Sequence, residues 1–339
     1  MQKLAQERNA TVLAVQSVKE KGILDVDVFE KMLRDPSIGP KVALVCMTHV
    51  PTNSGVVSPL EEVGAIIQIF NNNHRVHVSA KGSKDDAEEI ENNLFDRPIL
   101  YIVDACQSVG QMVVNVQHLK CDGLSACGRK YLRGPRGTGF LYMREEIAER
   151  VSPSHIDHAG APIAQVPDCP IIADVQFKYR AGARRFEFWE SSIANRLGLG
   201  KAVEYAMDIG LEKIESRCTE LALELQRQLR KIDGVTLHYD TSSFVEENSQ
   251  NAVTAKQCGI VTFSVNSLES SYVKAKLLEK RFTVSVVPAT STPLDSSRTK
   301  CKDLVRASLS YFNTMEEIAA FTNSLRQIIC VGVTTAGTS

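Results

Sequence analysis

The stretch that decides the fold runs from Tyr101 to Tyr142 and reads YIVDACQSVGQMVVNVQHLKCDGLSACGRKYLRGPRGTGFLY. It opens on an apolar, β-branched run that predicts a buried strand, and this strand delivers Asp104 at its carboxyl end. Lys130 follows 26 residues later, ahead of the cluster GPRGTG and a second strand-like run, 139–143. In open α/β sheets, ligands bind beyond the carboxyl ends of the strands. We therefore expect Asp104 and Lys130 to contribute to one site.

An acid and an amine placed in this way are what pyridoxal phosphate (PLP) chemistry requires. The lysine amine condenses with the cofactor aldehyde, and a carboxylate beside the pyridine nitrogen keeps that nitrogen protonated, so that the ring accepts electrons from a substrate carbanion. Gln107, about one turn beyond Asp104, is placed to donate a hydrogen bond to the phenolic oxygen of the ring. Taken singly, Asp104 reads as a helix N-cap and Lys130 as a surface charge, so the prediction rests on the ordered set.

The segments DACQSVGQMVVNV and CDGLSACGRKYLRGPRGTGFLYMR resemble the core of the class V aminotransferase family, which includes cysteine desulfurases, selenocysteine lyases and isopenicillin epimerase-like proteins. The resemblance implies an α/β protein of PLP-dependent transferase fold type I, with a mostly parallel central sheet flanked by helices and a smaller α+β carboxy-terminal domain. It implies Asp104 at the pyridine nitrogen, Gln107 at the phenolic oxygen and Lys130 as the lysine that forms the aldimine.

The turn PTNSGVV resembles the second cofactor loop of this family, in which an Asn three residues before the Gly contacts the ring. Thr52 holds that position here and Asn53 follows it, so both are candidate cofactor ligands; Asn53 is equally well explained as an Asx-type turn. Where the family has a phosphate-binding Ser, and desulfurases often have a His, this chain has Cys127 and Arg129. Arg129 either binds the phosphate electrostatically or marks a subfamily with different chemistry.

The segment LVRASLSYFNTMEEI resembles the carboxy-terminal signature of the family, whose Arg binds the substrate α-carboxylate. Arg306 stands at that position, and a guanidinium grips a carboxylate in a bidentate manner; otherwise it reads as an edge-strand charge. Desulfurases carry a nucleophilic cysteine upstream, and alignment on Pro293 places Ser291 or Thr290 there. Cys301 is out of register, although its flanking lysines favour a thiolate, so desulfuration is disfavoured without being excluded.

Length and composition predict two domains. A chain of 339 residues with 43% hydrophobic content is long enough for a large buried core. We expect a PLP-binding large domain over 1–210 with a polar surface insertion at about 71–97, a small α+β domain over 211–331, and a disordered tail over 332–339. The almost continuously apolar run 41–50 predicts a central parallel strand.

Net charge limits the classes of partner that we expect, and the cysteines indicate the cellular compartment. A formal net charge of −1 argues against nucleic acid or an anionic membrane as a partner, and no apolar run has the length of a membrane span. Nine scattered cysteines are typical of reduced thiols and a cytoplasmic protein. Organellar targeting stays open. The resemblance implies that the phosphate cradle of the family lies ahead of Met1, and a targeting segment would lie there too. No metal site is expected, since His74 and His77 lack suitably spaced partner ligands.

These observations predict a PLP-dependent enzyme that acts on a small molecule, an amino acid or a related amine, by an epimerase-, lyase- or transaminase-like reaction. We expect the enzyme to be a homodimer with its sites at the subunit interface. Two alternatives stay open. One is cysteine desulfurase or selenocysteine lyase-type activity, and the other is a non-catalytic paralogue that has lost cofactor binding. A nucleotide site at GPRGTG is disfavoured, because no Gly-Lys-Ser/Thr follows that cluster.

Overall fold

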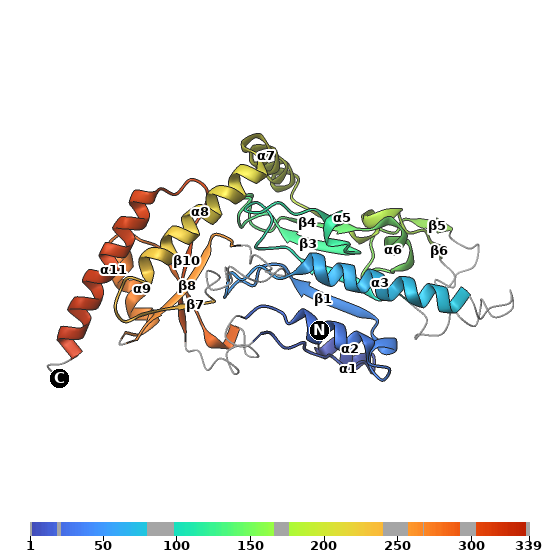
Figure 1. The fold of residues 1–339 in the computed structure, drawn as a ribbon. Helices are drawn as coiled ribbons and strands as arrows, with labels where there is room; N and C mark the ends of the chain where they lie inside the picture. Colours follow the sequence, from blue (N-terminus) through green and yellow to red (C-terminus); the bar gives the residue numbers. More distant parts are fainter. Residues whose placement is uncertain are drawn as a thin grey trace.

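The chain folds into two lobes, each built on a four-stranded sheet (Figure 1). The computed structural model describes residues 2–18, 22–79, 98–165, 176–239, 257–266, 268–291 and 303–336. Its elements in chain order are α1 (Gln2–Glu7), α2 (Val26–Arg34), η1 (Gly39–Lys41), β1 (Leu44–Thr48), α3 (Leu60–Ser79), β2 (Leu100–Asp104), α5 (Val116–Leu119), β3 (Gly123–Cys127), β4 (Gly139–Met143), α6 (Glu145–Arg150), β5 (Ile163–Gln165), β6 (Gln176–Phe177), η5 (Gly182–Phe186), α7 (Ile193–Ile209), α8 (Leu211–Leu229), β7 (Val235–His238), β8 (Ile260–Val265), α9 (Ser270–Glu279), β9 (Ser285–Val287), η7 (Ala289–Ser291), β10 (Leu304–Ser308) and α11 (Met315–Ala336).

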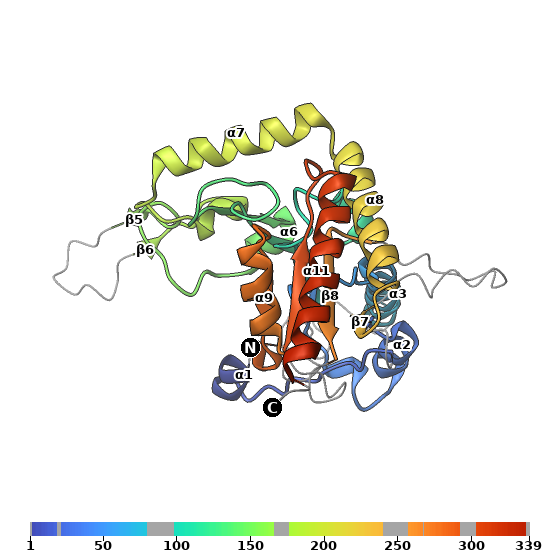
Figure 2. The same ribbon diagram turned by 90° about the vertical axis from the view of Figure 1, so that its left-hand side faces the viewer.

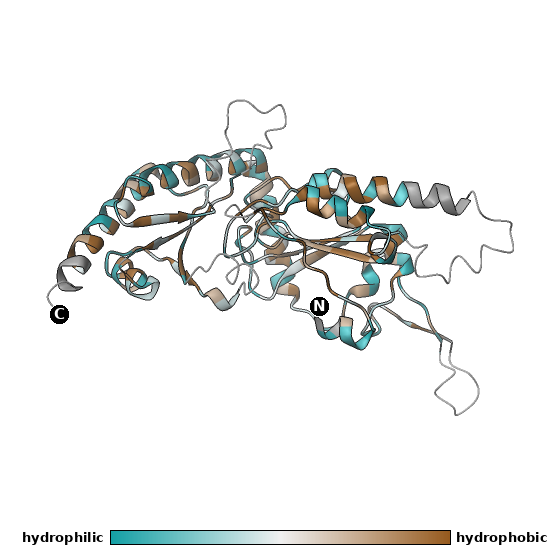
Figure 3. Ribbon diagram, turned by 60° about the horizontal axis from the view of Figure 1, so that its bottom comes forward, coloured by the Kyte–Doolittle hydropathy of each residue, from teal (hydrophilic) through white to brown (hydrophobic). Residues whose placement is uncertain are grey.

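The sheet of the large lobe has the order β1-β2-β3-β4. Its first three strands are parallel and β4 is antiparallel to β3. Asp104 pairs with Thr48 on one side and with Ser125 on the other, so β1 and β2 end level with each other and β3 continues two residues further. Helix α3 packs on the sheet through Leu60, Val63 and other apolar residues (Figure 3). The mostly parallel sheet predicted from the sequence is therefore confirmed, and Asp104 lies at the edge where ligands bind in such folds.

Strand β1 is not central among the described strands, because it pairs only with β2. Its residues alternate between exposed and half-buried positions, and the side chain of Leu44 is 44% exposed. Val45 and Met47 pack against the core of the lobe, whereas the opposite face of β1 is open within the described chain. The expectation of a central strand was wrong here, since an apolar run reports composition but does not say how many neighbours a strand has.

The small lobe is an antiparallel sheet of order β7-β8-β10-β9 covered by α8, α9 and α11 (Figure 1). Phe263 of β8 and Val305 of β10 are fully buried, and Leu225 of α8 and Leu325 of α11 pack into the same core. Helix α11 begins with a capping box: Thr314 Oγ1 accepts from the Glu317 backbone N–H, and the Thr314 N–H donates to Glu317. The predicted α+β architecture of this lobe is confirmed.

Gly210 joins α7 to α8 with a φ of +96°, a conformation that favours glycine. Helix α7 lies along the outside of the molecule, as Figure 2 shows. Helix α8 then contacts both lobes, because Cys218 packs with Leu132 of the large lobe while Leu225 packs into the small one. Among the described helices, none is both long and apolar enough to cross a bilayer.

Two expected irregular segments are partly helical. Helix α3 continues through Ser79, so the first part of the expected insertion belongs to this helix. Within the helix, the side-chain amide of Asn71 exchanges two hydrogen bonds with the backbone of Ile99. Residues 80–97 lie outside the described residues. Residues 332–336, part of the expected disordered tail, extend α11, and Gly332 comes close to Leu268 there.

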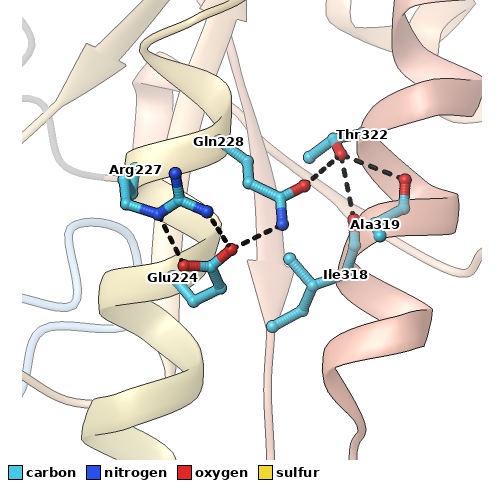
Figure 4. A network of polar contacts seen from close by, with 6 residues as sticks. All are labelled: Glu224, Arg227, Gln228, Ile318, Ala319 and Thr322. Carbon is cyan, nitrogen blue, oxygen red and sulfur yellow. Dashed lines mark hydrogen bonds and ion pairs between the residues drawn. The ribbon is translucent and has the colours of Figure 1, made fainter.

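A polar network joins α8 to α11 across the surface of the small lobe (Figure 4). Arg227 donates two hydrogen bonds to the Glu224 carboxylate, at 2.7 and 2.5 Å, and the Gln228 amide donates a third at 2.6 Å. Gln228 in turn accepts from the Thr322 hydroxyl of α11 at 2.6 Å. The hydrogen bonds from Arg227 and Gln228 lower the pKa of Glu224 from 4.5 to about 2.

We expect Glu224→Gln to destabilise the protein by about 1 kcal/mol at neutral pH, because one charge-assisted pair is lost. Since the folded-state pKa of Glu224 lies below its ordinary value, this contribution is complete above pH 4.5 and disappears as the pH falls towards about 2. Urea unfolding at pH 7 and pH 3 measures it. Glu279→Gln, at the exposed Lys276 pair, is the control and should change stability much less than Glu224→Gln. Equal effects at both positions would contradict the prediction.

Candidate active site

A cavity of about 450 Å³ opens between the two lobes. The large lobe contributes the loop after β1, the turn after β2 and the loop after β3, and the small lobe contributes β10 and the segment that follows it. The lining residues are Thr52, Gln107, Arg129, Lys130, Tyr131, Arg133, Arg306, Ser308, Leu309, Ser310 and Phe312. Five residues predicted from the sequence as site residues, Thr52, Gln107, Arg129, Lys130 and Arg306, therefore line one space.

Gln107 and Thr52 are held together by a hydrogen bond of 2.6 Å from Gln107 Nε2 to Thr52 Oγ1. Gln107 is 6% exposed, and its backbone carbonyl accepts from the Gln111 side chain at 2.6 Å. The other side-chain atom of Gln111, Oε1, accepts from the Gly259 N–H of the small lobe at 2.8 Å. The turn after β2 is thus fixed to its neighbouring loop and to the opposite lobe, which sets the orientation of the Gln107 amide.

Lys130 is half-buried on the loop after β3, where its carbonyl accepts from the Arg133 N–H at 2.8 Å. This loop lies directly against the turn that carries Gln107. Gly110, at φ +91°, comes so close that a Cβ atom there would stand 2.5 Å from the Leu132 nitrogen and 2.6 Å from the Tyr131 carbonyl carbon. Only a residue without a side chain permits this contact, which places the Gln107 turn and the Lys130 loop side by side.

We expect Gly110→Ala to cost about 3 kcal/mol of stability, because the added methyl group clashes with backbone atoms and the positive φ is strained. Gly137→Ala is the matched control: Gly137 also has a positive φ, +80°, but nothing lies within 4 Å of its Cβ position, so only strain of about 1 kcal/mol applies. Urea unfolding of both variants compares the two effects. Equal destabilisation would mean that the close approach at Gly110 is unimportant.

Arg306 belongs to β10, an interior strand paired with both β8 and β9. Its interpretation as an edge-strand charge is therefore wrong. The NH1 group donates to the Thr52 carbonyl at 2.9 Å and so reaches across from the small lobe to the large one. Its Nε is shielded from solvent and finds no hydrogen-bond partner among the described residues. Buried donors are rarely left unsatisfied in folded proteins, so this atom points to a ligand with acceptor oxygens.

The cavity is strongly cationic. Arg129, Lys130, Arg133 and Arg306 line it, and no Asp or Glu stands among its described lining residues. Tyr131, which follows Lys130, also lines it; desolvation by burial raises the pKa of this phenol well above its ordinary value, and the tyrosine stays neutral. An arrangement of this kind suits a ligand with negative charge, such as a phosphate or a carboxylate.

Arg133 is a lining residue that the sequence interpretation missed. Its guanidinium lies 5.6 Å from the ring centroid of Tyr205, 4.8 Å from that of Tyr311 and 5.3 Å from that of Phe312, and it donates to the Tyr311 hydroxyl. These contacts stabilise the cation by its attraction to the ring faces. Arg133 stands three residues after Lys130, so its position in the motif was the available signal.

Three predicted site residues are not among those lining the cavity. Asp104 is exposed at the end of β2, and its Oδ1 accepts from the Cys106 N–H at 2.9 Å. Asn53 is 8% exposed, next to Thr52. Cys127 ends β3, and its thiol donates to the Cys106 carbonyl at 3.8 Å. All three lie on or directly before the loops that form the cavity, and their contact with a cofactor stays a prediction.

The positions expected to replace a nucleophilic cysteine are only partly described. Thr290 and Ser291 form the short helix η7, and neither lines the cavity. Pro293 and Cys301 lie outside the described residues. No cysteine is found among the described residues that line the cavity.

Comparison with known proteins identifies the family of this chain. The family model described as Aminotransferase class-V matches residues 74–321. A probable cysteine desulfurase of Methanothermobacter thermautotrophicus is 28% identical over 283 residues, which cover 82% of this chain and 65% of the relative. A probable cysteine desulfurase of Pyrococcus abyssi is 26% identical over 328 residues, covering 97% of this chain and 68% of the relative. The chain thus spans about two thirds of the length of these relatives.

Solved structures agree with this relationship. The apo structure of cysteine desulfurase from Thermococcus onnurineus NA1 has a TM-score of 0.74 and 26% identity, over 96% of this chain and 68% of that one. The cysteine desulfurase CsdA of Escherichia coli has a TM-score of 0.75 at 18% identity, over 97% of this chain and 68% of that one, and so supports the fold alone. Because the family model matches most of the chain, this protein belongs to the aminotransferase class-V family.

Proposed function

We propose that this chain is a PLP-dependent enzyme that removes sulfur from cysteine or a closely related amino acid. The observation that carries the proposal is the cavity between the lobes, where Lys130, Gln107 and Arg306 from three distant segments line one cationic space. The names of the relatives, cysteine desulfurase in each case, support desulfuration over the epimerase-, lyase- or transaminase-like reaction expected first.

The lining of the cavity fits PLP. Its four cationic side chains suit a ligand with a phosphate group, and the unpartnered Arg306 Nε suits a second acidic group beside it. Lys130 would bind the cofactor aldehyde and Arg129 would hold the phosphate. The Gln107 amide gives one hydrogen to Thr52 and keeps its second for the phenolic oxygen. When bound, PLP supplies an electron-withdrawing ring that stabilises negative charge at the substrate Cα.

The residues of this chain would act on the substrate in separate roles. Arg306 binds the α-carboxylate through Nε and the adjacent amino group, while its NH1 stays tethered to the Thr52 carbonyl. The Lys130 amine moves the proton at the substrate Cα. The rings of Tyr131 and Phe312 border the same space and displace water from it. Asp104 remains the proposed partner of the pyridine nitrogen, because it lies at the strand end next to the Gln107 turn.

Two outcomes of Cβ–S cleavage differ in the fate of sulfur. In desulfuration, a thiol attacks the cysteine sulfur, the Cβ–S bond breaks, Cβ gains a proton and alanine leaves behind a persulfide. In elimination, sulfide leaves directly and the remainder hydrolyses to pyruvate and ammonia. The structure of a cystine C-S lyase, with a TM-score of 0.64, has the same fold. Since no cysteine stands among the described lining residues, a desulfurating thiol would come from a segment such as that of Cys301.

Incubation of the protein with PLP, L-cysteine and dithiothreitol tests the proposal. Sulfide and alanine in equal amounts are expected, and Cys301→Ser should lower alanine formation if Cys301 is the accepting thiol. Sulfide matched by pyruvate would assign elimination. Exchange of the Cα hydrogen with D₂O, without sulfide release, would return the assignment to an epimerase-like reaction and contradict the proposal.

A second copy of the chain is the proposed partner. Large apolar side chains are exposed on α7 and the segment before it, including Trp189 at 69%, Ile193 at 71% and Leu197 at 71%. Exposed apolar side chains, when they gather on one surface, are typical of protein interfaces. Sedimentation equilibrium should give twice the mass of one chain, and Ile193→Asp together with Leu197→Asp should reduce it to one. The cytoplasm is the proposed compartment, supported by the seven described cysteines, none of which forms a disulfide.

A further inference from the structure

Two thiols lie side by side beneath the loops of the cavity. Cys106 follows β2 and Cys127 ends β3, and each stands two residues beyond the paired positions Asp104 and Ser125. The Ala105 N–H donates to the Ser125 carbonyl at 2.8 Å, which continues the parallel pairing up to this point. Neighbouring strands are about 4.8 Å apart, and a disulfide spans Cα atoms about 4.4–6.8 Å apart. The pairing therefore brings the two residues to neighbouring positions just beyond the paired parts of the two strands.

The side chains are turned towards each other. The Cys127 thiol lies 3.8 Å from the carbonyl oxygen of Cys106, and the two thiols are close enough to influence each other's ionisation. Both are free and half-buried, so a small reagent reaches them while water is partly excluded. Cys121 offers a contrast within the same lobe: it is buried and bonds to the Val116 carbonyl, also through its thiol, at 3.9 Å.

From this geometry we propose that Cys106 and Cys127 form a dithiol site that reacts with small-molecule disulfides and closes an intramolecular disulfide. One of the two thiols, as its thiolate, attacks the disulfide RSSR, forming a mixed disulfide and releasing one RSH. The sulfur of the other cysteine then attacks the protein sulfur of the mixed disulfide and releases the second RSH. The two cysteines lose two electrons and two protons, and RSSR gains both.

The environment of Cys106 affects the rate of this reaction and the stability of its product. Burial, together with the neighbouring Asp104 carboxylate, raises the pKa of the Cys106 thiol to about 12. A thiol that ionises so poorly attacks slowly, and it is also a poor leaving group once oxidised. The cross-link is therefore expected to form slowly and to resist reduction.

The cross-link would act on the cavity, and this part of the inference rests on the proposed function. Cys106 lies between Asp104 and Gln107, and Cys127 stands three residues before Lys130. A disulfide would tie the two loops that carry these side chains into one fixed arrangement. Because the Cys127 position is the one expected to meet the cofactor phosphate, bound PLP and the disulfide should each disfavour the other by the same factor.

Treatment of the purified protein with oxidised glutathione, without added PLP, tests the dithiol site alone. The expected result is a mass loss of two hydrogens per chain, with a peptide map that joins Cys106 to Cys127. Cys106→Ser and Cys127→Ser should each abolish the cross-link, whereas Cys121→Ser, the matched control, should retain it. Separate glutathione adducts without this cross-link, or unmodified thiols in both positions, would overturn the proposal. If a variant fails to fold, the peptide map of the wild-type protein still shows whether Cys106 and Cys127 are joined.

A second arm adds saturating PLP before oxidised glutathione. Protection that slows cross-linking by about tenfold or more supports the mutual exclusion. Cross-linking at an unchanged rate, in protein that shows the absorbance of bound PLP, would overturn the exclusion and leave the dithiol site intact. Absence of that absorbance signals failure of the proposed function instead, which keeps the two failures distinguishable.

Discussion

Replacing Lys130 by alanine is expected to abolish the absorbance band at about 420 nm that the protein should acquire with PLP. The amine of Lys130 is the proposed covalent partner of the cofactor aldehyde, and it lines the cavity together with Gln107 and Arg129. We also expect sulfide release from cysteine to fall by about a thousandfold or more, because covalent attachment and proton movement at the substrate Cα are lost together. Spectra of the protein titrated with PLP, and a sulfide assay, measure the two effects.

Lys201→Ala is the matched control for Lys130→Ala. Lys201 is also a lysine of the large lobe, but its side chain is 76% exposed on α7, where it pairs with Glu204. This variant should keep both the absorbance band and the activity. An unchanged band in Lys130→Ala, or its loss in both variants, would show that another lysine binds PLP and that the assignment of the cavity is wrong.

Replacing Arg306 by alanine is expected to lower kcat/KM for cysteine by about 100- to 1000-fold. A bidentate, charge-assisted contact with the α-carboxylate is lost, which corresponds to about 3–4 kcal/mol. The absorbance of bound PLP should remain, since the cofactor is proposed to be held by Lys130 and Arg129. Cysteamine, which has the amine and thiol of cysteine but no carboxylate, is the discriminating substrate. Steady-state kinetics with both compounds measure the effect.

The wild-type protein and Arg306→Ala should process cysteamine equally, and Arg306→Lys should recover part of the activity on cysteine because it restores the charge without the planar fork. The lost hydrogen bond to the Thr52 carbonyl is monitored separately through thermal unfolding. If activity on cysteamine falls as much as activity on cysteine, Arg306 acts on the structure of the cavity and does not bind the substrate carboxylate.

Several local features followed from the sequence because their causes are local. The β-branched run that ends in Asp104 predicted β2, in which Tyr101 and Val103 are buried and Leu100 and Ile102 are half-buried. Gln107 and Lys130 were identified from their places in a motif, and both line the cavity. The α+β character of the small lobe followed from strands and helices whose periodicities are visible over 5–20 residues.

Other features needed the tertiary structure. The sequence left Thr52 and Asn53 as alternatives; Thr52 lines the cavity and bonds to Gln107, whereas Asn53 does not line it. The edge position of β1 and the extension of α11 past Gly332 depend on which neighbours pack there. Composition alone does not report those neighbours.

The sequence by itself determined the set of reactive side chains and the strands that carry them, since both are recognised from short runs of residues. What only the tertiary structure decided is their convergence. Arg306 and Thr52 are 254 positions apart, yet they share a hydrogen bond and one cavity. Contacts between residues so far apart in the chain depend on how the two lobes pack against each other, through residues such as Gln111, Cys258 and Gly55. That packing depends on the shapes of the buried surfaces, and a short run of sequence does not specify those shapes.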